Sequence, residues 1–299
     1  MAARRGIGRS VRLLALGPFF YLRRTPGAAI VLILLVLFLT LLTQVGGALL
    51  WLGLPALDLL VRSLPGPRVW RLIAAAGVFV PAYLAASLLI VPPLAAQVGR
   101  VPLACGWYGA ETAYGALTTA TCLFNRHYAT PAARDVLAAT ARRLAADFPG
   151  RRLSYLDSGF PFFSWFPMLP HLSHGDGRKV DVALLFVDPA TGGPLPGRAP
   201  SPVGYWGFLQ PKPGATLPCG RGSSWRRWNF DWLQPLLPEL RLDEAALAAL
   251  LMDLAASRQV SRVFVEPHVG ARLGIEHRKM RFQGCAAARH DDHIHVEFR

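Results

Sequence analysis

The first third of the chain has almost no acidic residues. Asp58 is the single acidic residue among residues 1–100, which contain ten arginines. This segment therefore has a net charge of +9, out of +14 for the whole chain. The 299-residue chain also lacks a recognisable helix-turn-helix, zinc finger or RNA-binding motif to accompany this charge. Nucleic-acid binding is therefore disfavoured. Because the arginines flank hydrophobic runs, we interpret them as charge at a membrane boundary.

Cysteines are few and widely spaced. The sequence contains Cys105, Cys122, Cys219 and Cys285, and no two of them form a CxxC pair. This spacing disfavours a structural zinc knuckle. All four follow the hydrophobic runs, and their even number is compatible with disulfides in an oxidising periplasm. Buried free thiols are the alternative explanation.

Two runs nearly free of charge predict an integral membrane region. Residues 28–61 contain one charged side chain and exceed the roughly 20 apolar residues needed to cross a bilayer. Residues 72–96 are uncharged, and Pro81 and Pro92 would kink a helix there without preventing a span. The first run is too long for a signal peptide, and no clean cleavage site follows it. We therefore predict a transmembrane anchor of two or three spans within residues 1–100.

The arginines leave two topologies open. Six of them precede residue 25 and three more lie between the hydrophobic runs, so both segments are expected on the cytoplasmic side. Both can be cytoplasmic only if residues 28–61 cross twice, as a hairpin bent near Gly46 and Gly47, and residues 72–96 cross a third time. A two-span arrangement would instead return the C-terminal portion to the side of the N-terminus.

Residues 101–299 have the patterns of a mixed α/β domain. Thr130 and Pro131 are a typical helix start, and apolar residues follow at helical spacing. Residues 188–235 are rich in glycine, proline and tryptophan, which predicts long loops with aromatic anchors. The predicted helices are residues 130–148, 242–257 and a segment within 223–237, and the predicted strands are residues 152–157, 180–187, 262–266 and the C-terminal end.

Three histidines lie within six residues of one another near the C-terminus. In a strand, residues two apart share a face, so His293 and His295 project together while Ile294 and Val296 point the other way. His290 lies three residues upstream, where a turn is predicted, and can approach the same point. A polar edge strand is the alternative, since short histidine-rich tracts also bind metal opportunistically.

Asp181 is a carboxylate inside a predicted apolar strand. A buried carboxylate is costly unless it is paired or bound to a metal. His174 precedes Asp181 by seven residues, with Gly175 and Gly177 between them, so a turn lets the histidine fold back over the aspartate. An imidazole from the terminal strand would complete a three-ligand set with an open fourth position, which is typical of a catalytic zinc site.

Two segments resemble the penicillin-insensitive murein endopeptidases, a branch of the LAS metallopeptidases that includes the D-alanyl-D-alanine carboxypeptidases and dipeptidases. They are HLSHGDGRKVD (171–181) and RVFVEPHVGARL (262–273) with RHDDHIHVEF (289–298). The family pattern is HxxHxxGxxxD followed by HxxHxH, and both halves occur here in order and at the family's spacing. The resemblance covers about residues 150–299. It implies an α+β metallopeptidase domain in residues 101–299, with a small antiparallel sheet flanked by helices.

The resemblance assigns roles to six residues. It implies that Zn²⁺ is bound by His174, Asp181 and His295. His293 would stand beside the metal-bound water as general base or transition-state partner. Two further histidines match those that line the family's active site and are candidates for stabilising the oxyanion: His290 and His171.

The implied activity is metal-assisted amide hydrolysis. The implied substrate is a peptide cross-link of peptidoglycan with a D-alanyl residue on the acyl side, and the implied location is the inner membrane with the catalytic domain in the periplasm. A D-alanyl-D-alanine carboxypeptidase or dipeptidase is a second interpretation, although those enzymes typically have glutamate where His290 stands. A third is a catalytically silent zinc module that binds cell-wall peptides or scaffolds a membrane assembly.

The chain departs from the family pattern in two respects. Lys179 stands two positions before Asp181, where the family usually has an acidic residue, and this change is expected to act on metal affinity through the groups around the ligands. The family is also usually soluble and periplasmic, whereas this chain has a multi-span anchor. The anchor alters the location of the enzyme and leaves the implied chemistry unchanged.

Overall fold

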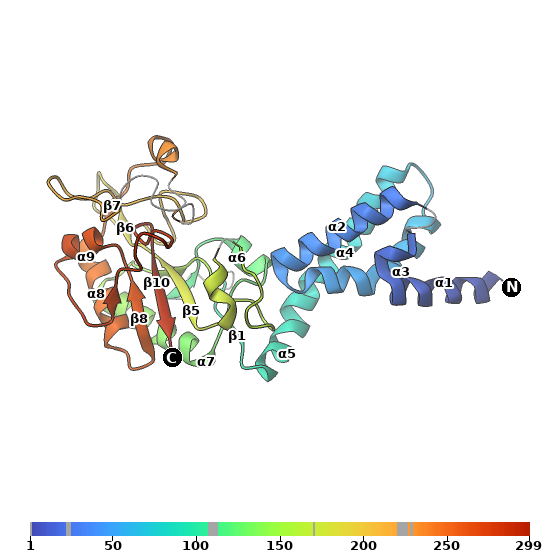
Figure 1. Ribbon diagram of the computed structural model, residues 1–299, viewed down its shortest axis with the longest axis horizontal. Helices are drawn as coiled ribbons and strands as arrows, with labels where there is room; N and C mark the ends of the chain where they lie inside the picture. The colour runs from blue at the N-terminus through green and yellow to red at the C-terminus, as the bar shows by residue number, and fades with distance from the viewer. Residues whose placement is uncertain (1, 22–24, 107–112, 170, 220–226, 228–229) are drawn as a thin grey trace.

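The computed structural model describes the whole chain except residues 1, 22–24, 107–112, 170, 220–226 and 228–229. The N-terminal helices and a mixed α/β region lie at opposite ends of the molecule (Figure 1). The N-terminal elements are α1 (Ala2–Leu16), η1 (Gly17–Tyr21), α2 (Pro26–Thr43), α3 (Gly46–Ser63), α4 (Arg68–Ala85), the π-helix η2 (Ala86–Ile90) and α5 (Val91–Gln97).

Among the residues that the structure describes, three helices are long and apolar enough to cross a membrane. They are α2, α3 and the continuous helix Arg68–Gln97, which comprises α4, η2 and α5. These helices indicate membrane association, and the first hydrophobic run of the sequence is a hairpin of two helices. This arrangement agrees with the three-span alternative and not with the two-span one.

Glycine permits the close approach of α2 and α3 at their turn. Gln44 and Val45 separate the two helices, and α3 begins with Gly46 and Gly47. A Cβ on Gly47 would overlap Thr40 Oγ1 and the backbone oxygen of Val36 in α2. The bend expected near the glycine pair is therefore present, and a side chain at residue 47 would force the two helices apart.

Prolines do not interrupt the third helix. Pro81 lies inside α4, and Pro92 lies in the first turn of α5. A proline removes one backbone donor and crowds the preceding turn. The helix widens to a π-turn at Ala86–Ile90, immediately before Pro92, and then continues. This agrees with a kinked but unbroken span.

Asp58 neutralises arginines at the end of the helical region that lies away from the α/β region. Asp58 Oδ2 lies 2.8 Å from Arg9 Nε and 3.0 Å from Arg62 Nε. The hydroxyl of Tyr21 donates to Asp58 Oδ1 at 2.6 Å. The single acidic residue of the anchor thus ties α3 to α1 and η1.

The described part of the α/β region contains three sheets. The largest has six strands in the order β2-β4-β5-β10-β8-β9, and two small sheets pair β1 with β3 and β6 with β7. The strands are β1 (Val101–Pro102), β2 (Tyr114–Ala116), β3 (Tyr128–Ala129), β4 (Leu153–Tyr155), β5 (Lys179–Ala183), β6 (Phe186–Val187), β7 (Arg241–Leu242), β8 (Val260–Phe264), β9 (Met280–Arg281) and β10 (His293–Phe298). The helices are α6 (Thr119–Leu123), α7 (Pro131–Asp147), η3 (Leu172–Asp176), η5 (Asp231–Leu236), α8 (Glu244–Ala256) and α9 (Pro267–Leu273).

The main core lies between one face of the six-stranded sheet and the helices α7 and α8. Val180 and Val182 of β5 and Ile294 and Val296 of β10 are fully buried in this core. These are the even-numbered positions of the two strands, so the odd-numbered positions project from the opposite face. The pattern of alternation in the sequence therefore assigns Asp181, His293 and His295 to the other face, as expected.

The helices predicted at residues 130–148 and 242–257 both form, and the cap predicted at Thr130 is present. The hydroxyl oxygen of Thr130 accepts a hydrogen bond from the backbone of Ala133 at the start of α7. A carboxylate oxygen of Asp243 accepts one from the backbone of Ala246 at the start of α8. Such caps satisfy a backbone donor that has no partner within the helix.

Two details of the predicted elements were wrong, and a third lies partly outside the described residues. Residues 180–187 are not one strand, because the backbone oxygen of Leu185 accepts from Asp243 and the chain passes into β6, which pairs with β7. The main sheet is antiparallel only in its centre, since β2 pairs with β4 and β8 with β9 in parallel. Within 223–237 only η5 is a regular element among the described residues, and most of residues 223–229 lie outside them.

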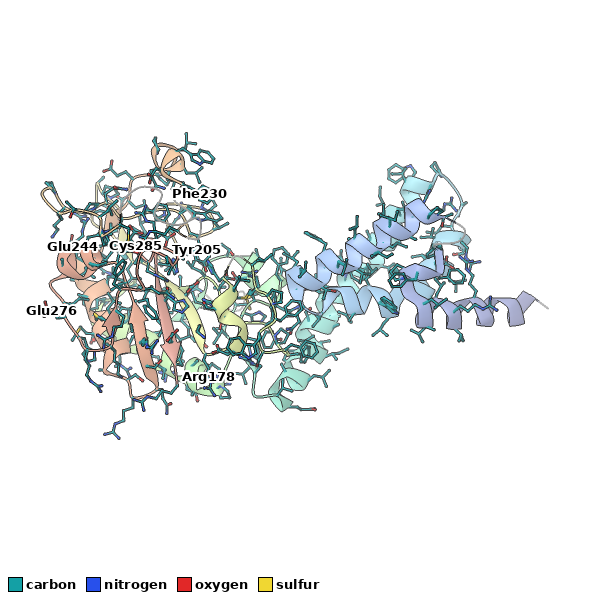
Figure 2. The ribbon with its side chains drawn as sticks, viewed as in Figure 1. Arg178, Tyr205, Phe230, Glu244, Glu276 and Cys285 are labelled. Atoms are coloured by element: carbon teal, nitrogen blue, oxygen red, sulfur yellow. A yellow bond between two sulfur atoms is a disulfide. The ribbon has the colours of Figure 1, made fainter. Side chains whose placement is uncertain are left out.

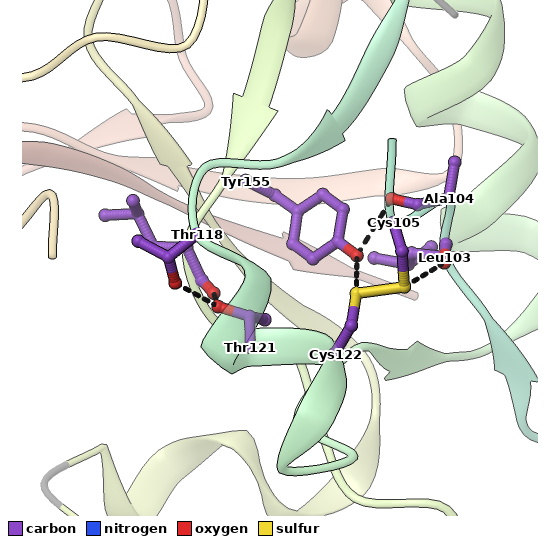
Figure 3. The surroundings of a disulfide bond; sticks show 8 residues. Leu103, Ala104, Cys105, Thr118, Thr121, Cys122 and Tyr155 are labelled. Atoms are coloured by element: carbon purple, nitrogen blue, oxygen red, sulfur yellow. Dashed lines mark hydrogen bonds between the residues drawn. A yellow bond between two sulfur atoms is a disulfide. The ribbon is translucent and has the colours of Figure 1, made fainter. Parts of the chain in front are cut away.

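All four cysteines form disulfides. The pairs are Cys105–Cys122 and Cys219–Cys285, so the free-thiol alternative was wrong. Figure 3 shows the first pair beside Tyr155, whose hydroxyl donates to the backbone oxygen of Ala104 at 3.0 Å. Paired cysteines are typical of a protein that folds in an oxidising compartment.

Candidate metal centre

The candidate metal centre is built on the pairing of β5 with β10. The register places His295 directly opposite Asp181, and residues directly opposite each other project from the same face of a sheet. His295 Nδ1 lies 2.8 Å from Asp181 Oδ1. His293, two residues earlier on β10, projects from the same face. Strand register alone therefore brings the C-terminal histidines to Asp181.

His174 reaches the same point from the turn that precedes β5. It lies in η3, and Gly177 is the residue that follows this helix. Gly177 has a φ of 65°, a left-handed conformation that glycine adopts without strain. His174 Nδ1 donates to the backbone oxygen of Ser158 at 2.8 Å. Because a carbonyl oxygen only accepts, this bond fixes the proton on Nδ1 and leaves Nε2 to offer its lone pair toward Asp181.

The three predicted ligands converge and are almost fully buried. His174 Nε2 lies 3.2 Å from Asp181 Oδ1 and 3.2 Å from His295 Nδ1, which completes a triangle with the 2.8 Å contact above. Zinc bonds of about 2.0–2.1 Å at tetrahedral angles would place such donors roughly 3.3 Å apart. The chemistry and the spacing of these three donors therefore fit one small divalent cation.

His171 offers an alternative third ligand. His171, His174 and Asp181 also form a group whose ligand atoms lie within 4.8 Å of one another. However, His171 Nδ1 lies beside the other carboxylate oxygen, 2.9 Å from Asp181 Oδ2. Its side chain is 15% exposed, whereas that of His295 is 4% exposed. We favour His295 because it shares Oδ1 with His174, while His171 is the more accessible of the two to a substrate.

His293 is held between two carboxylates. Its Nδ1 lies 2.5 Å from Asp292 Oδ1, and its Nε2 lies 3.7 Å from Asp181 Oδ1. Asp292 is held in turn by the backbone N–H of Trp206, which donates to its other oxygen. Burial alone would lower the pKa of His293, but the charges of Asp181 and Asp292 raise it to about 9.

His290 and His295 are favoured in the neutral form. Burial lowers the pKa of His295 to about 4, despite the opposing charge of Asp181. Burial, reinforced by His293 and His295, holds the pKa of His290 well below its ordinary value. A neutral imidazole keeps a lone pair, which a metal ligand needs. The His290 ring centroid lies 5.1 Å from that of His293, so the predicted neighbour is in place.

Three residues around Asp181 were not predicted as part of the site. Tyr205 Oη lies 2.8 Å from Asp181 Oδ2 and 3.1 Å from Asp157 Oδ2, and can donate to either. Arg126 donates to both oxygens of Asp157 at 2.6 and 2.9 Å. The Arg126 guanidinium counters the effect of burial and keeps the pKa of Asp157 below its usual range. Tyr205, Asp157 and Arg126 thus form a buried support behind the ligand.

Some of these residues have a sequence pattern that indicates a place in the site, and others do not. Asp157 ends a predicted strand, so it carried the same signal as Asp181, an acidic residue in an apolar segment. The sequence context of Asp292 predicts a turn residue, with the orientation of a histidine as the less favoured alternative, and its bond to His293 agrees with that alternative. Tyr205 lies in the glycine- and proline-rich loop segment, where no periodic pattern indicates which side chains face the sheet.

Lys179 is paired outside the centre. Its ammonium group lies 2.8 Å from Asp176 Oδ2, and Asp176 Oδ1 accepts from the backbone of Arg178 at 3.0 Å. Asp176 therefore serves the turn. The departure from the family pattern at residue 179 introduces a cation that is balanced locally.

A second group of ligand-type residues, Cys105, Cys122 and His127, has suitable spacing for a metal. The two cysteines are joined in a disulfide, so neither can supply a thiolate. We therefore assign no metal to this group.

The candidate centre opens into a cavity of about 440 Å³, a size typical of ligand pockets. Its walls combine the site histidines with Trp206, Phe208, Arg227 and Arg289. Arg178, beside the turn that precedes β5, lies away from Tyr205 at the other end of the sheet (Figure 2). The basic side chains of the wall come instead from the loop segments.

No family model matches the sequence, and no curated protein matches it. The interpretation of the site therefore depends on its two histidine motifs and on the geometry described above.

Proposed function

We propose that the chain is a membrane-anchored zinc metallopeptidase that hydrolyses peptide bonds of peptidoglycan, with D-alanyl cross-links as the substrate. The observation that carries this proposal is the convergence of His174 Nε2, Asp181 Oδ1 and His295 Nδ1, with mutual distances of 2.8 to 3.2 Å, at a cavity. The choice of peptidoglycan comes from the resemblance of the two motifs to murein endopeptidases.

The donor set favours a catalytic metal over a structural one. Structural zinc sites are usually closed by four protein ligands, whereas two histidines and one aspartate leave a position open. The bond from His174 Nδ1 to the backbone of Ser158 orients that ligand. A bound zinc ion would polarise the scissile carbonyl and supply an activated water molecule at neutral pH.

His293 is the residue placed to move protons. Asp292 accepts from Nδ1, so Nε2 is the nitrogen that faces the reacting groups. An imidazole in this position can take a proton at Nε2 and return it to the leaving amine. The two carboxylates that raise its pKa favour the protonated form, and a cation bound at Asp181 offsets the charge of one of them, which returns the pKa toward neutrality.

His171 and His290 are the candidates to stabilise negative charge on the scissile carbonyl oxygen. Their ring centroids lie 5.9 and 5.1 Å from that of His293. His171 is the more exposed of the two, so it is the first to meet an incoming peptide. Removal of one such hydrogen-bond donor from the oxyanion hole of a hydrolase raises the activation free energy by about 3 kcal/mol.

The arrangement of the helices supports a periplasmic catalytic domain. With three crossings, the arginine-rich segments lie at one end of the helical bundle and the α/β region at the other (Figure 1). The positive-inside tendency then assigns the arginine-rich end to the cytoplasm. The two disulfides also favour the oxidising side of the inner membrane, where cross-linked wall is accessible.

Digestion of purified sacculi tests the proposal. The full chain in detergent is loaded with zinc and incubated with cross-linked sacculi, and the muropeptides are identified by mass spectrometry. We expect cross-linked dimers to be converted to monomers, and we expect His293→Ala to lower the rate by about 10² to 10⁴. Release of D-alanine or of its dipeptide from intact cross-links would favour the carboxypeptidase or dipeptidase. Bound zinc without any product would favour a silent binding module.

A further inference from the structure

The loop that precedes η3 exposes large apolar side chains. In residues 160–169, here called the aromatic loop, Phe163 is 67% exposed and Trp165 is 80% exposed, whereas Phe160 and Met168 are buried. The loop is therefore folded against the domain and presents only selected side chains. Burying a large apolar side chain is worth roughly 1.5–3 kcal/mol, so this exposure indicates a surface that is covered by a partner.

The aromatic loop is attached to the end of the membrane hairpin. The backbone N–H of Phe162 donates to Gln44 Oε1 at 2.8 Å, and Gln44 Nε2 donates to the backbone oxygen of Phe163 at 3.4 Å. Gln44 is the residue that follows α2, in the turn to α3. The Phe162 side chain also packs with a cluster that contains Val45 and Val91. When α2 and α3 span the bilayer, the aromatic loop lies at its surface.

Arg100 attaches the same loop to the end of the third membrane helix. This arginine follows α5 and is 4% exposed. One guanidinium nitrogen donates to Ser164 Oγ at 3.1 Å and to the backbone oxygen of Gly175 at 3.2 Å. The aromatic loop is thus bonded to both places where the membrane helices meet the domain, which fixes its height above the bilayer.

We propose that the aromatic loop is a lipid-contacting edge of the domain, with Phe163 and Trp165 inserted into the interfacial layer of the bilayer. Residues 159–170 contain no charged side chain, which favours lipid over an acidic or basic protein partner. Tryptophan is enriched at the level of the lipid headgroups, where its apolar ring and its N–H are both accommodated. The continuity of the loop with the membrane helices selects this occupant over a soluble protein.

This contact sets the position of the catalytic cavity. The backbone N–H of Trp165 donates to the oxygen of Gly175 in η3, beside His174. Leu169 and Leu172 line the cavity and are each 59% exposed. One rim of the cavity is therefore held at the membrane surface, which would restrict access to peptides close to the bilayer.

Quenching of tryptophan fluorescence by brominated lipid tests the contact without any measurement of activity. The full chain is reconstituted in phosphatidylcholine vesicles with and without bromine at the 6,7 positions of an acyl chain. The emission of Trp165 is obtained by subtracting the fluorescence of Trp165→Phe from that of the wild type in the same vesicles. We expect brominated lipid to lower this emission at least about twofold, as for a tryptophan at the interface.

Trp232→Phe is the matched control. Trp232 is 68% exposed and belongs to η5, in the part of the α/β region that lies away from the membrane helices (Figure 1). Its difference emission should be the same in both kinds of vesicle. A second variant, Phe163→Trp combined with Trp165→Phe, moves the reporter within the loop and should restore the quenched emission.

Absence of quenching at both loop positions would overturn the proposal and leave the loop facing water or a protein. Equal quenching of Trp165 and Trp232 would also overturn it, because the effect would not be specific to the loop. Since no step depends on hydrolysis, this result is independent of the outcome with sacculi.

Discussion

At the scale of single residues, the site is defined by how completely Asp181 is surrounded. One carboxylate oxygen faces His174 and His295, and the other faces His171 and Tyr205. The four contacts are between 2.8 and 3.2 Å, and Asp181 is 1% exposed. The pKa of Asp181 is held well below its usual range because the surrounding histidines outweigh the effect of burial. A carboxylate in this state stays ionised at mildly acidic pH and is therefore available to bind a cation.

Asp292→Asn removes the charge of Asp292 and leaves one acceptor oxygen, which can keep the bond from His293 Nδ1 or the bond from the backbone of Trp206, but not both. The charge of Asp292 helps to raise the pKa of His293, so its loss lowers that pKa. We expect kcat/KM to fall about 10- to 100-fold, and the limb of the pH profile that reports His293 to move to lower pH. Zinc content should be unchanged. A pH profile that stays in place would contradict the assigned role of His293.

The burial of His127 is expected to make the protein less stable at mildly acidic pH. Burial lowers its pKa to about 4, whereas the unfolded chain takes up a proton near pH 6.5. Between those values the unfolded state binds more protons, so the free energy of unfolding falls as the pH decreases. The expected loss between pH 7 and pH 5 is about 2 kcal/mol. His127→Phe should remove this part of the pH dependence in thermal melting curves, and an unchanged slope would contradict it.

The sequence allowed the histidines of β10 to be placed but not Tyr205. The two-residue period of a strand is a local property, so His293 and His295 could be assigned to one face and Ile294 and Val296 to the other. Tyr205 reaches Asp181 from a loop without periodicity. Its contact depends on how that whole loop folds over the sheet, which no local pattern encodes.

At the scale of elements, the α2–α3 hairpin depends on a glycine. Gly47→Ala should destabilise the protein, because a Cβ at this position overlaps Thr40 and Val36. Gly53 lies in the same helix with its nearest neighbour, Leu57 Cδ1, at 3.9 Å. Gly53→Ala should therefore be neutral or stabilising by about 0.5–1 kcal/mol. Melting temperatures in detergent test the pair, and equal values for the two variants would contradict the packing described.

Elements with caps were predictable, and changes of strand partner were not. Thr130 and Asp243 mark the starts of α7 and α8 because capping depends on neighbours in the sequence. The apolar run 180–187 indicates burial, but it does not encode where the chain leaves one sheet for another. That point is set by the bond between Leu185 and Asp243, which lie far apart in the sequence.

At the scale of the whole molecule, the three-helix anchor predicts opposite locations for its two ends. Alkaline phosphatase fused after Arg299 should be active, because the enzyme needs the periplasm to form its disulfides. The same reporter inserted at Gly66, between α3 and α4, should be inactive. Activity at Gly66, or none after Arg299, would place the site away from the wall and would require a different substrate.

Charge counting could not decide this topology, since both arrangements place the N-terminus in the cytoplasm. The break at Gln44 and Val45 favours three crossings over two, because it divides one hydrophobic run into two helices that are each long and apolar enough to cross a membrane. The disulfide partners were equally beyond prediction. Cys219 and Cys285 are 66 residues apart, and four cysteines allow three pairings.

Metal content is the most direct test of the central claim that His174, Asp181 and His295 hold one divalent cation. The full chain, purified without a polyhistidine tag and dialysed after zinc loading, is analysed by mass spectrometry of the bound metal. We expect one zinc per chain for the wild type and for His171→Ala, and less than about one tenth of that for His174→Ala and His295→Ala. Both disulfides should remain intact in each variant. Retention of zinc by His295→Ala, or its loss from His171→Ala, would contradict the account.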